Sequence, residues 1–89
     1  MAEIKGGVHH SYECMEMIAD VKQDIIEFGD DCEVYAVKRK GKHGTAWYID
    51  YYYELNNLVE DQAGLNGDTL VKTTLGELLP ALIKQNDII

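Results

Sequence analysis

Positive charge is scarce in this chain of 89 residues, which has eight Lys and Arg residues against sixteen Asp and Glu residues. The net charge at pH 7 is therefore −8 when histidine is counted as neutral. Nucleic acids and anionic lipid surfaces are bound mainly through basic patches. The acidic balance thus argues against a simple nucleic-acid binder and against a protein that seeks anionic membranes.

Long apolar runs are also missing, because no run approaches the roughly 18 residues of a membrane-spanning helix. The first ten residues lack the apolar core of a secretory signal peptide. Cys14 and Cys32 are the only cysteines, too few for a disulfide framework. We therefore expect a soluble, cytoplasmic protein with reduced cysteines.

Motifs of catalysis and of cofactor binding are absent. The single serine, Ser11, suits a helix cap, and the chain has no nucleophile elbow, phosphate-binding glycine loop or metalloprotease signature. Two weak alternatives are a zinc site from His10, Cys14, Cys32 and His43 and a reactive pair of Cys32 with His43. Paired C-x-x-C spacing is missing, so we expect no bound metal, no cofactor and no enzyme activity.

A chain of this length forms one domain, residues 1–89, and buries only about 64% of its surface. Residues 1–10 are expected to be a lead-in, because Gly6 and Gly7 interrupt regular structure. A helix is predicted over residues 11–28, capped by Ser11 and ended by Gly29. Its apolar stripe has the spacing 4, 3, 4, 3 and consists of Cys14, Ile18, Val21, Ile25 and Phe28.

The rest of the chain predicts a small sheet and a second helix. Residues 32–38 and 45–53 are rich in β-branched and aromatic side chains and form a hairpin around the loop 39–44. A third strand is predicted over 68–72, after a polar segment with one helical turn around Leu58.

The C-terminal helix begins with the capping box of Thr74 and Glu77, and either kinks or restarts at Pro80. The predicted fold class is therefore α+β, with an N-terminal amphipathic helix on an antiparallel three-stranded sheet and a C-terminal helix.

Six acidic residues follow one side of the first helix, with the spacing 3, 4, 4, 3, 4. They fall within an arc of roughly 80° beside the apolar stripe. Like charges at these spacings each cost about 0.2–0.5 kcal/mol, so local stability does not favour them. A row of carboxylates resembles a row of phosphates and is a candidate partner-binding surface; the alternative is a solvated face that serves solubility. This acidic stripe consists of Glu13, Glu16, Asp20, Asp24, Glu27 and Asp31.

Tyrosines crowd the second strand of the predicted hairpin. Strict alternation puts Trp47, Ile49, Tyr51, Tyr53 and Leu55 on the core face. The opposite face then carries a candidate partner-binding set of tyrosines and carboxylates. The alternative is that helices cover both faces and bury these rings. The set consists of Tyr48, Asp50, Tyr52 and Glu54.

Four of the eight cations gather at the predicted hairpin tip. They are candidate phosphate contacts, although basic tips also serve only to protect edge strands. These residues are Lys38, Arg39, Lys40 and Lys42.

Together these features predict a small acidic inhibitor or regulator that binds a basic protein partner. The expected target is a nucleic-acid-handling enzyme whose phosphate groove the carboxylates would occupy. Phage-encoded anti-defence inhibitors, immunity proteins and antitoxins are similar in size and charge alone. The alternative is a structural or adaptor module that forms a homodimer through its tyrosine-rich strand.

Overall fold

The computed structural model describes the backbone of residues 7–41, 44 and 46–88, and the side chains of residues 14–41, 44 and 46–87. Its elements are α1 (Gly7–Phe28), β1 (Glu33–Lys40), β2 (Ala46–Tyr52), α2 (Asn57–Asn66), β3 (Thr69–Thr74) and α3 (Leu75–Ile88). The predicted α+β class is confirmed. Within these residues, none of the helices combines the length and the apolar character that crossing a membrane requires.

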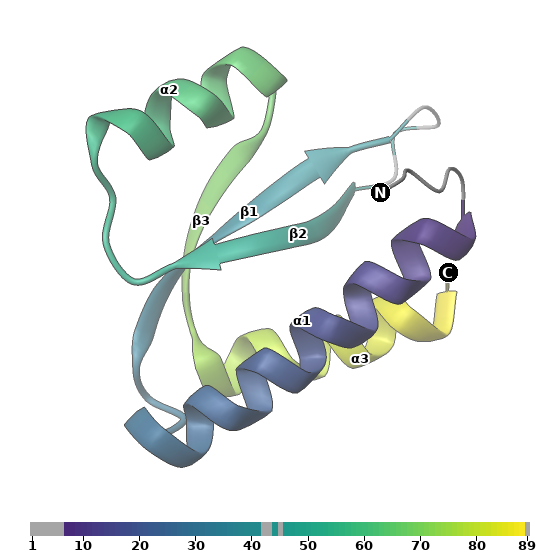
Figure 1. The fold of residues 1–89 in the computed structure, drawn as a ribbon, viewed down its shortest axis with the longest axis vertical. Coiled ribbons are helices and arrows are strands. Elements are labelled where there is room, and N and C mark those ends of the chain that lie inside the picture. The colour runs from purple at the N-terminus through teal and green to yellow at the C-terminus, as the bar shows by residue number, and fades with distance from the viewer. Residues whose placement is uncertain (1–6, 42–43, 45, 89) are drawn as a thin grey trace.

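The sheet has the order β2-β1-β3, and its central strand β1 is antiparallel to both neighbours. Helices α1 and α3 lie side by side against one face of this sheet (Figure 1). Helix α2 connects β2 to β3 and lies apart from the other two helices, over the opposite face (Figure 1). The edge strand β2 therefore lies between α1 on one side and α2 on the other.

The core lies between β1 and the helix pair. Val34 and Ala36 of β1 are fully buried there, as are Leu75 and Leu82 of α3. Burial of each large aliphatic side chain contributes about 1.5–3 kcal/mol to folding. The complete buried cluster consists of Cys14, Met17, Val21, Val34, Ala36, Leu75, Leu78 and Leu82.

Helix α1 ends where the sequence predicts and begins earlier. It ends at Phe28, and Gly29 follows in the left-handed region with φ 94°. Its first residue is Gly7, four positions before the predicted cap, so Ser11 lies inside the helix. The predicted start is wrong because glycine costs little at a helix end, and no helix breaker stands between Gly7 and Ser11.

Strand β2 contains a bulge that reverses its side-chain alternation. Asp50 lies opposite Val37 and Tyr48 lies opposite Lys38, so Ile49 is one residue too many for its partner strand. Tyr48 and Tyr51 consequently both pack against the core. The predicted placement of Tyr48 on the outer face is wrong for this reason.

The segment after β2 forms more helix than predicted. Helix α2 spans ten residues, where the sequence suggests one turn around Leu58. Its cap explains the length, because the Asn56 side chain accepts a 2.9 Å hydrogen bond from the Val59 N–H. Gly67 ends the helix at φ 73°. Strand β3 then runs two residues beyond its predicted end at Lys72.

Helix α3 begins at the predicted capping box. The Glu77 N–H donates a 3.2 Å hydrogen bond to the Thr74 hydroxyl. The helix then runs on through Pro80 as one element, so it does not restart there.

An ion pair connects the C-terminal end of β1 to the residue that precedes β3. The Arg39 guanidinium donates from Nε to Asp68 Oδ1 at 2.8 Å and from Nη2 to Oδ2 at 3.0 Å. The Asp68 side chain is only 3% exposed, whereas that of Arg39 is 41% exposed. A bidentate pair of this kind satisfies a carboxylate that would otherwise be buried without a counter-charge.

The substitution Arg39→Met should lower the free energy of unfolding by about 2–3 kcal/mol, because it leaves Asp68 buried and unpaired. Urea denaturation followed by circular dichroism measures the change. Lys40→Met, at the exposed next residue, is the matched control and should shift stability by less than about 0.5 kcal/mol. Equal losses in the two variants would show that the ion pair does not stabilise the fold.

Candidate functional site

Burial of the core stripe of α1 turns its acidic side toward the edge strand β2. Cys14 and Val21 face the core, and Glu16, Asp20 and Asp24 lie next to them around the helix. Two hollows of about 360 and 340 Å³ lie between these carboxylates and β2. Both hollows include Asp20, Asp50 and Tyr51, so they form one continuous depression. We call it the acidic groove, and its polar lining consists of Glu16, Asp20, Gln23, Asp24, Arg39, Asp50, Tyr51 and Tyr53.

Asp24 joins the two walls of this groove. Its Oδ2 accepts a 2.6 Å hydrogen bond from the Tyr51 hydroxyl and a further hydrogen bond from the Tyr53 hydroxyl. The Tyr51 and Tyr53 rings meet edge to face with centroids 6.0 Å apart. Phe28 at the end of α1 contacts Tyr53 in the same manner, at 5.5 Å. These contacts fix both tyrosine rings at one end of the groove.

The tyrosine hydroxyls of the groove stay protonated well above neutral pH. Burial raises the pKa of Tyr51 and of Tyr53, and the hydrogen bond to Asp24 raises each pKa further. Asp50 raises the pKa of Tyr52 in the same direction through its negative charge. Tyr51 and Tyr53 therefore act as hydrogen-bond donors toward Asp24 at physiological pH.

The remaining carboxylates of the groove, Glu16, Asp20 and Asp50, outnumber the cation that lines it, Arg39. Glu16, Asp20 and Asp50 form no ion pair with any cation in the part of the chain that the structure describes. Asp50 accepts a 2.8 Å hydrogen bond from the Tyr51 N–H, while Glu16 and Asp20 are exposed. Arg39 also lines the groove, and its Nε and Nη2 bond to Asp68. The groove therefore presents negative charge to the solvent.

The structure brings part of the predicted acidic stripe together with part of the predicted strand face. Glu27 and Asp31 are exposed but do not line the groove, and Asp31 lies in the turn after α1. The Glu13 side chain lies outside the described residues. Glu54 is exposed beyond the end of β2. Of the predicted partner-binding residues, Glu16, Asp20, Asp24 and Asp50 line the groove.

The groove tyrosines depart in part from the sequence prediction. Tyr51 packs against the core as predicted, and it also lines the groove, where its hydroxyl bonds to Asp24. Tyr53, predicted on the core face, is 42% exposed and lines the groove. Tyr48, predicted on a partner surface, packs against the core. The run of three tyrosines was the available signal, because one strand face cannot bury three consecutive rings.

The predicted basic tip does not gather into one site. Lys38 lies 5.1 Å from the centroid of the Tyr48 ring, on the side of the sheet that faces α1 and α3. Arg39 bonds to Asp68 and also lines the acidic groove. Lys40 is exposed, and Lys42 lies outside the described residues. Phosphate contact through these cations stays a prediction.

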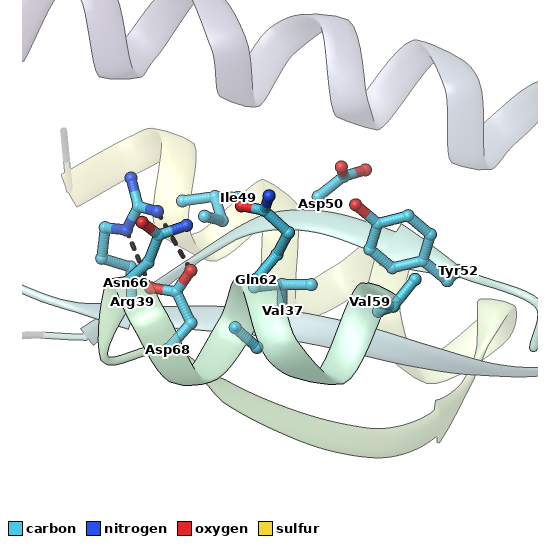
Figure 2. A pocket seen from close by; sticks show the side chains of 10 residues that line it. Val37, Arg39, Ile49, Asp50, Tyr52, Val59, Gln62, Asn66 and Asp68 are labelled. Atoms are coloured by element: carbon cyan, nitrogen blue, oxygen red, sulfur yellow. Dashed lines mark hydrogen bonds and ion pairs between the residues drawn. The ribbon is translucent and has the colours of Figure 1, made fainter. Parts of the chain in front are cut away.

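A second cavity of about 300 Å³ lies between α2 and the other side of β1 and β2 (Figure 2). The pair of Arg39 and Asp68 closes one end of it, and Tyr52 and Val59 lie at the other (Figure 2). Val37 and Ala63 are buried in its wall. Tyr52 therefore faces α2 and is separated from the tyrosines of the acidic groove.

The described side chains form no metal site. No three His, Cys, Asp or Glu residues among them are placed to bind one metal ion together. Cys14 is buried, its thiol donates to the Leu82 carbonyl at 3.4 Å, and burial raises its pKa. The side chains of His10 and His43, which both weak alternatives require, lie outside the described residues.

Comparison with protein-family models, with curated proteins and with solved structures finds no match for this chain, so its function must be inferred from its own residues.

Replacing both groove tyrosines, Tyr51→Phe with Tyr53→Phe, should reduce stability at pH 7 by about 1–3 kcal/mol, because two hydrogen bonds to a carboxylate are lost. It should also flatten the pH dependence at the alkaline end. In the wild type the folded pKa values lie above the unfolded value of 10, so the unfolded state releases its protons first. This contribution is complete below pH 10 and is lost as the pH rises further.

Urea midpoints measured from about pH 8 to about pH 11 test this expectation. Tyr35→Phe is the matched control, because no carboxylate accepts from that hydroxyl among the described side chains. An alkaline slope that is the same in all three proteins would contradict the role assigned to Asp24.

Proposed function

We propose that this chain is a small acidic inhibitor or regulator that binds a basic protein partner through the acidic groove. The proposed partner is a nucleic-acid-handling enzyme, and the chain acts by binding rather than by catalysis. The observation that carries the proposal is the convergence of carboxylates from two elements. Glu16 and Asp20 from α1 and Asp50 from β2 line one hollow, and the cation that also lines it, Arg39, forms its ion pair with Asp68.

The arrangement of these charges suits a surface that normally binds phosphates. Glu16, Asp20 and Asp24 follow one another about 6 Å apart along the axis of α1. A regular row of negative charge on a rigid rod resembles the phosphate backbone of a nucleic acid in sign and, loosely, in spacing. Lys and Arg residues of a phosphate groove would supply counter-charges for Glu16, Asp20 and Asp50, and the attraction would speed association.

The tyrosines supply the part of the binding energy that charge does not. Asp24 holds the Tyr51 and Tyr53 hydroxyls, so both rings are ordered before a partner arrives. Preformed aromatic surface loses little side-chain entropy on binding. Tyrosine at the centre of an interface is also a frequent hot spot. Tyr53, which is partly exposed beside Phe28, is the proposed aromatic anchor.

The alternative of a homodimer through the tyrosine-rich strand has less support. The Gln85 side chain accepts from the Tyr48 N–H at 2.7 Å and donates to the Tyr48 carbonyl at 2.9 Å. Asp50 accepts from the next outward N–H, that of Tyr51. A second β2 strand would need these same backbone groups for pairing. The edge of β2 is therefore protected against strand addition at both positions.

The charge-reversal variant Glu16→Lys with Asp20→Lys should lose partner binding without unfolding, because both side chains are exposed. We expect the tagged wild-type chain to capture one basic nucleic-acid enzyme from host lysate. Capture should survive nuclease treatment and weaken with salt, and the chain should displace nucleic acid from that enzyme. The reversed chain should bind at least about 100-fold more weakly.

Glu60→Lys with Asp61→Lys is the matched control, since it makes the same change of charge on the exposed surface of α2. It should retain capture and inhibition. Loss of capture in both variants would mean that net charge alone attracts the partner. Retention in both variants would show that the acidic groove is only a solvated face.

A further inference from the structure

Helix α2 turns amides toward the sheet and leucines toward solvent. Two of the four α2 side chains that line the cavity over the sheet are carboxamides, whereas Leu58 and Leu65 are 69% and 83% exposed. A helix that covers a sheet normally buries its leucines and exposes its amides. A departure from this rule without a visible gain in stability is typical of functional sites. The four lining side chains are Val59, Gln62, Ala63 and Asn66.

This face leaves a hollow under α2 in place of a packed layer. Ala63 is buried there, and its small side chain does not fill the space between α2 and the sheet. We call the resulting cavity of about 300 Å³, which has Val37 and Ile49 in its wall, the α2 cavity. Its volume lies at the lower end of the range of roughly 300–1,000 Å³ for small-molecule sites. At about 30 Å³ for each water-sized group, it holds roughly ten non-hydrogen atoms.

The charges that line the α2 cavity leave one carboxylate without a counter-charge. They belong to Arg39, Asp50 and Asp68. Arg39 and Asp68 balance each other through their bidentate ion pair. Asp50 accepts a hydrogen bond from the Tyr51 N–H and forms no ion pair with a cation among the described residues. A ligand with one positive charge would therefore complete the balance of charge in this cavity.

The polar groups that suit such a ligand meet at Asp50. Figure 2 shows the Asp50 carboxylate beside the Tyr52 hydroxyl, with the Gln62 amide on the same side of the cavity. The negative charge of Asp50 raises the pKa of Tyr52, so this hydroxyl stays protonated at neutral pH. The face of a tyrosine ring attracts cations, and a glutamine carbonyl accepts hydrogen bonds from an ammonium group. The carboxylate, the ring face and the carbonyl all favour a cation over an anion.

We propose that the α2 cavity binds a small organic cation, whose ammonium group pairs with Asp50 and whose apolar body lies against Val37, Ile49 and Val59. The volume limits the body to about the size of one aromatic ring. Asp50 also lines the acidic groove, so the carboxylates of the groove add to the attraction for a cation. The proposal concerns the chain by itself and does not rest on the function proposed for the acidic groove.

The probe is 2-phenylethylammonium, which combines one aromatic ring with one ammonium group. Added to the ¹⁵N-labelled chain, it should shift the amides of Ile49–Tyr52 and Val59–Asn66, with a dissociation constant below about 1 mM. The neutral 2-phenylethanol, which has the same shape, should bind at least about 10-fold more weakly, and the anion 3-phenylpropionate should cause no shifts. A cation that fails to bind, that binds no better than the alcohol, or that shifts only other amides would overturn the proposal.

Asp50→Asn tests the charge, because it removes the carboxylate and keeps an acceptor for the Tyr51 N–H at an exposed position. It should weaken binding of the probe at least about 10-fold. Asp61→Asn, on the exposed surface of α2, makes the same change of charge outside the cavity and is the matched control. Equal affinities in these two variants would show that Asp50 does not hold the ammonium group.

Val59→Phe tests the cavity, because the larger ring occupies the space of the apolar body. It should abolish the shifts caused by the probe, whereas Leu58→Phe, the matched control at an exposed position of α2, should preserve them. Unchanged binding in Val59→Phe, with circular dichroism showing a folded chain, would place the probe elsewhere and overturn the proposal. Val59 does not line the acidic groove, so this variant should still capture the basic partner, and the two proposals fail independently.

Discussion

Burial of one stripe of α1 decides where every other side chain of that helix lies. Cys14, Met17 and Val21 must face α3 and the centre of the sheet, because they supply a large share of a small core. A helix has no freedom to rotate once that stripe is buried. Glu16, Asp20 and Asp24 of the acidic stripe are then directed at the edge strand β2, and Met15 and Ile26 are directed at solvent. The acidic groove is thus a consequence of core packing and needs no loop or ligand to form it.

Two local features of β2 complete the groove. The bulge at Ile49 turns Tyr51 toward α1, and Asp24 then accepts hydrogen bonds from Tyr51 and Tyr53. These hydrogen bonds give Asp24 a structural role, whereas Glu16 and Asp20 are exposed and have no such role. Repulsion among the unpaired acids reduces stability, and the hydrogen bonds at Asp24 offset part of that cost. A partner that brings cations would relieve the rest.

The fold class and most elements could be predicted from the sequence, because helix and strand periodicities and the capping residues around Gly29 and Thr74 are local signals. The spacing of Glu16, Asp20 and Asp24 also predicted that they share a helix face. Other features depend on the third dimension. The bulge at Ile49 is set by register with β1, so alternation assigned Tyr48 to the wrong surface. The approach of Asp50 to α1 and the Arg39 pair with Asp68 join segments that are distant in sequence.

The most direct measurement is a titration of the ¹⁵N-labelled chain with its captured enzyme, followed by amide chemical shifts. If the acidic groove is the binding surface, the amides of Glu16–Asp24 and Asp50–Tyr53 should shift or broaden at low salt and recover at high salt. The amides of α2 and β3 should stay unchanged, because they lie away from the groove. Shifts confined to α2 or to the edge of β3 would contradict the assignment of the groove and place binding elsewhere on the chain.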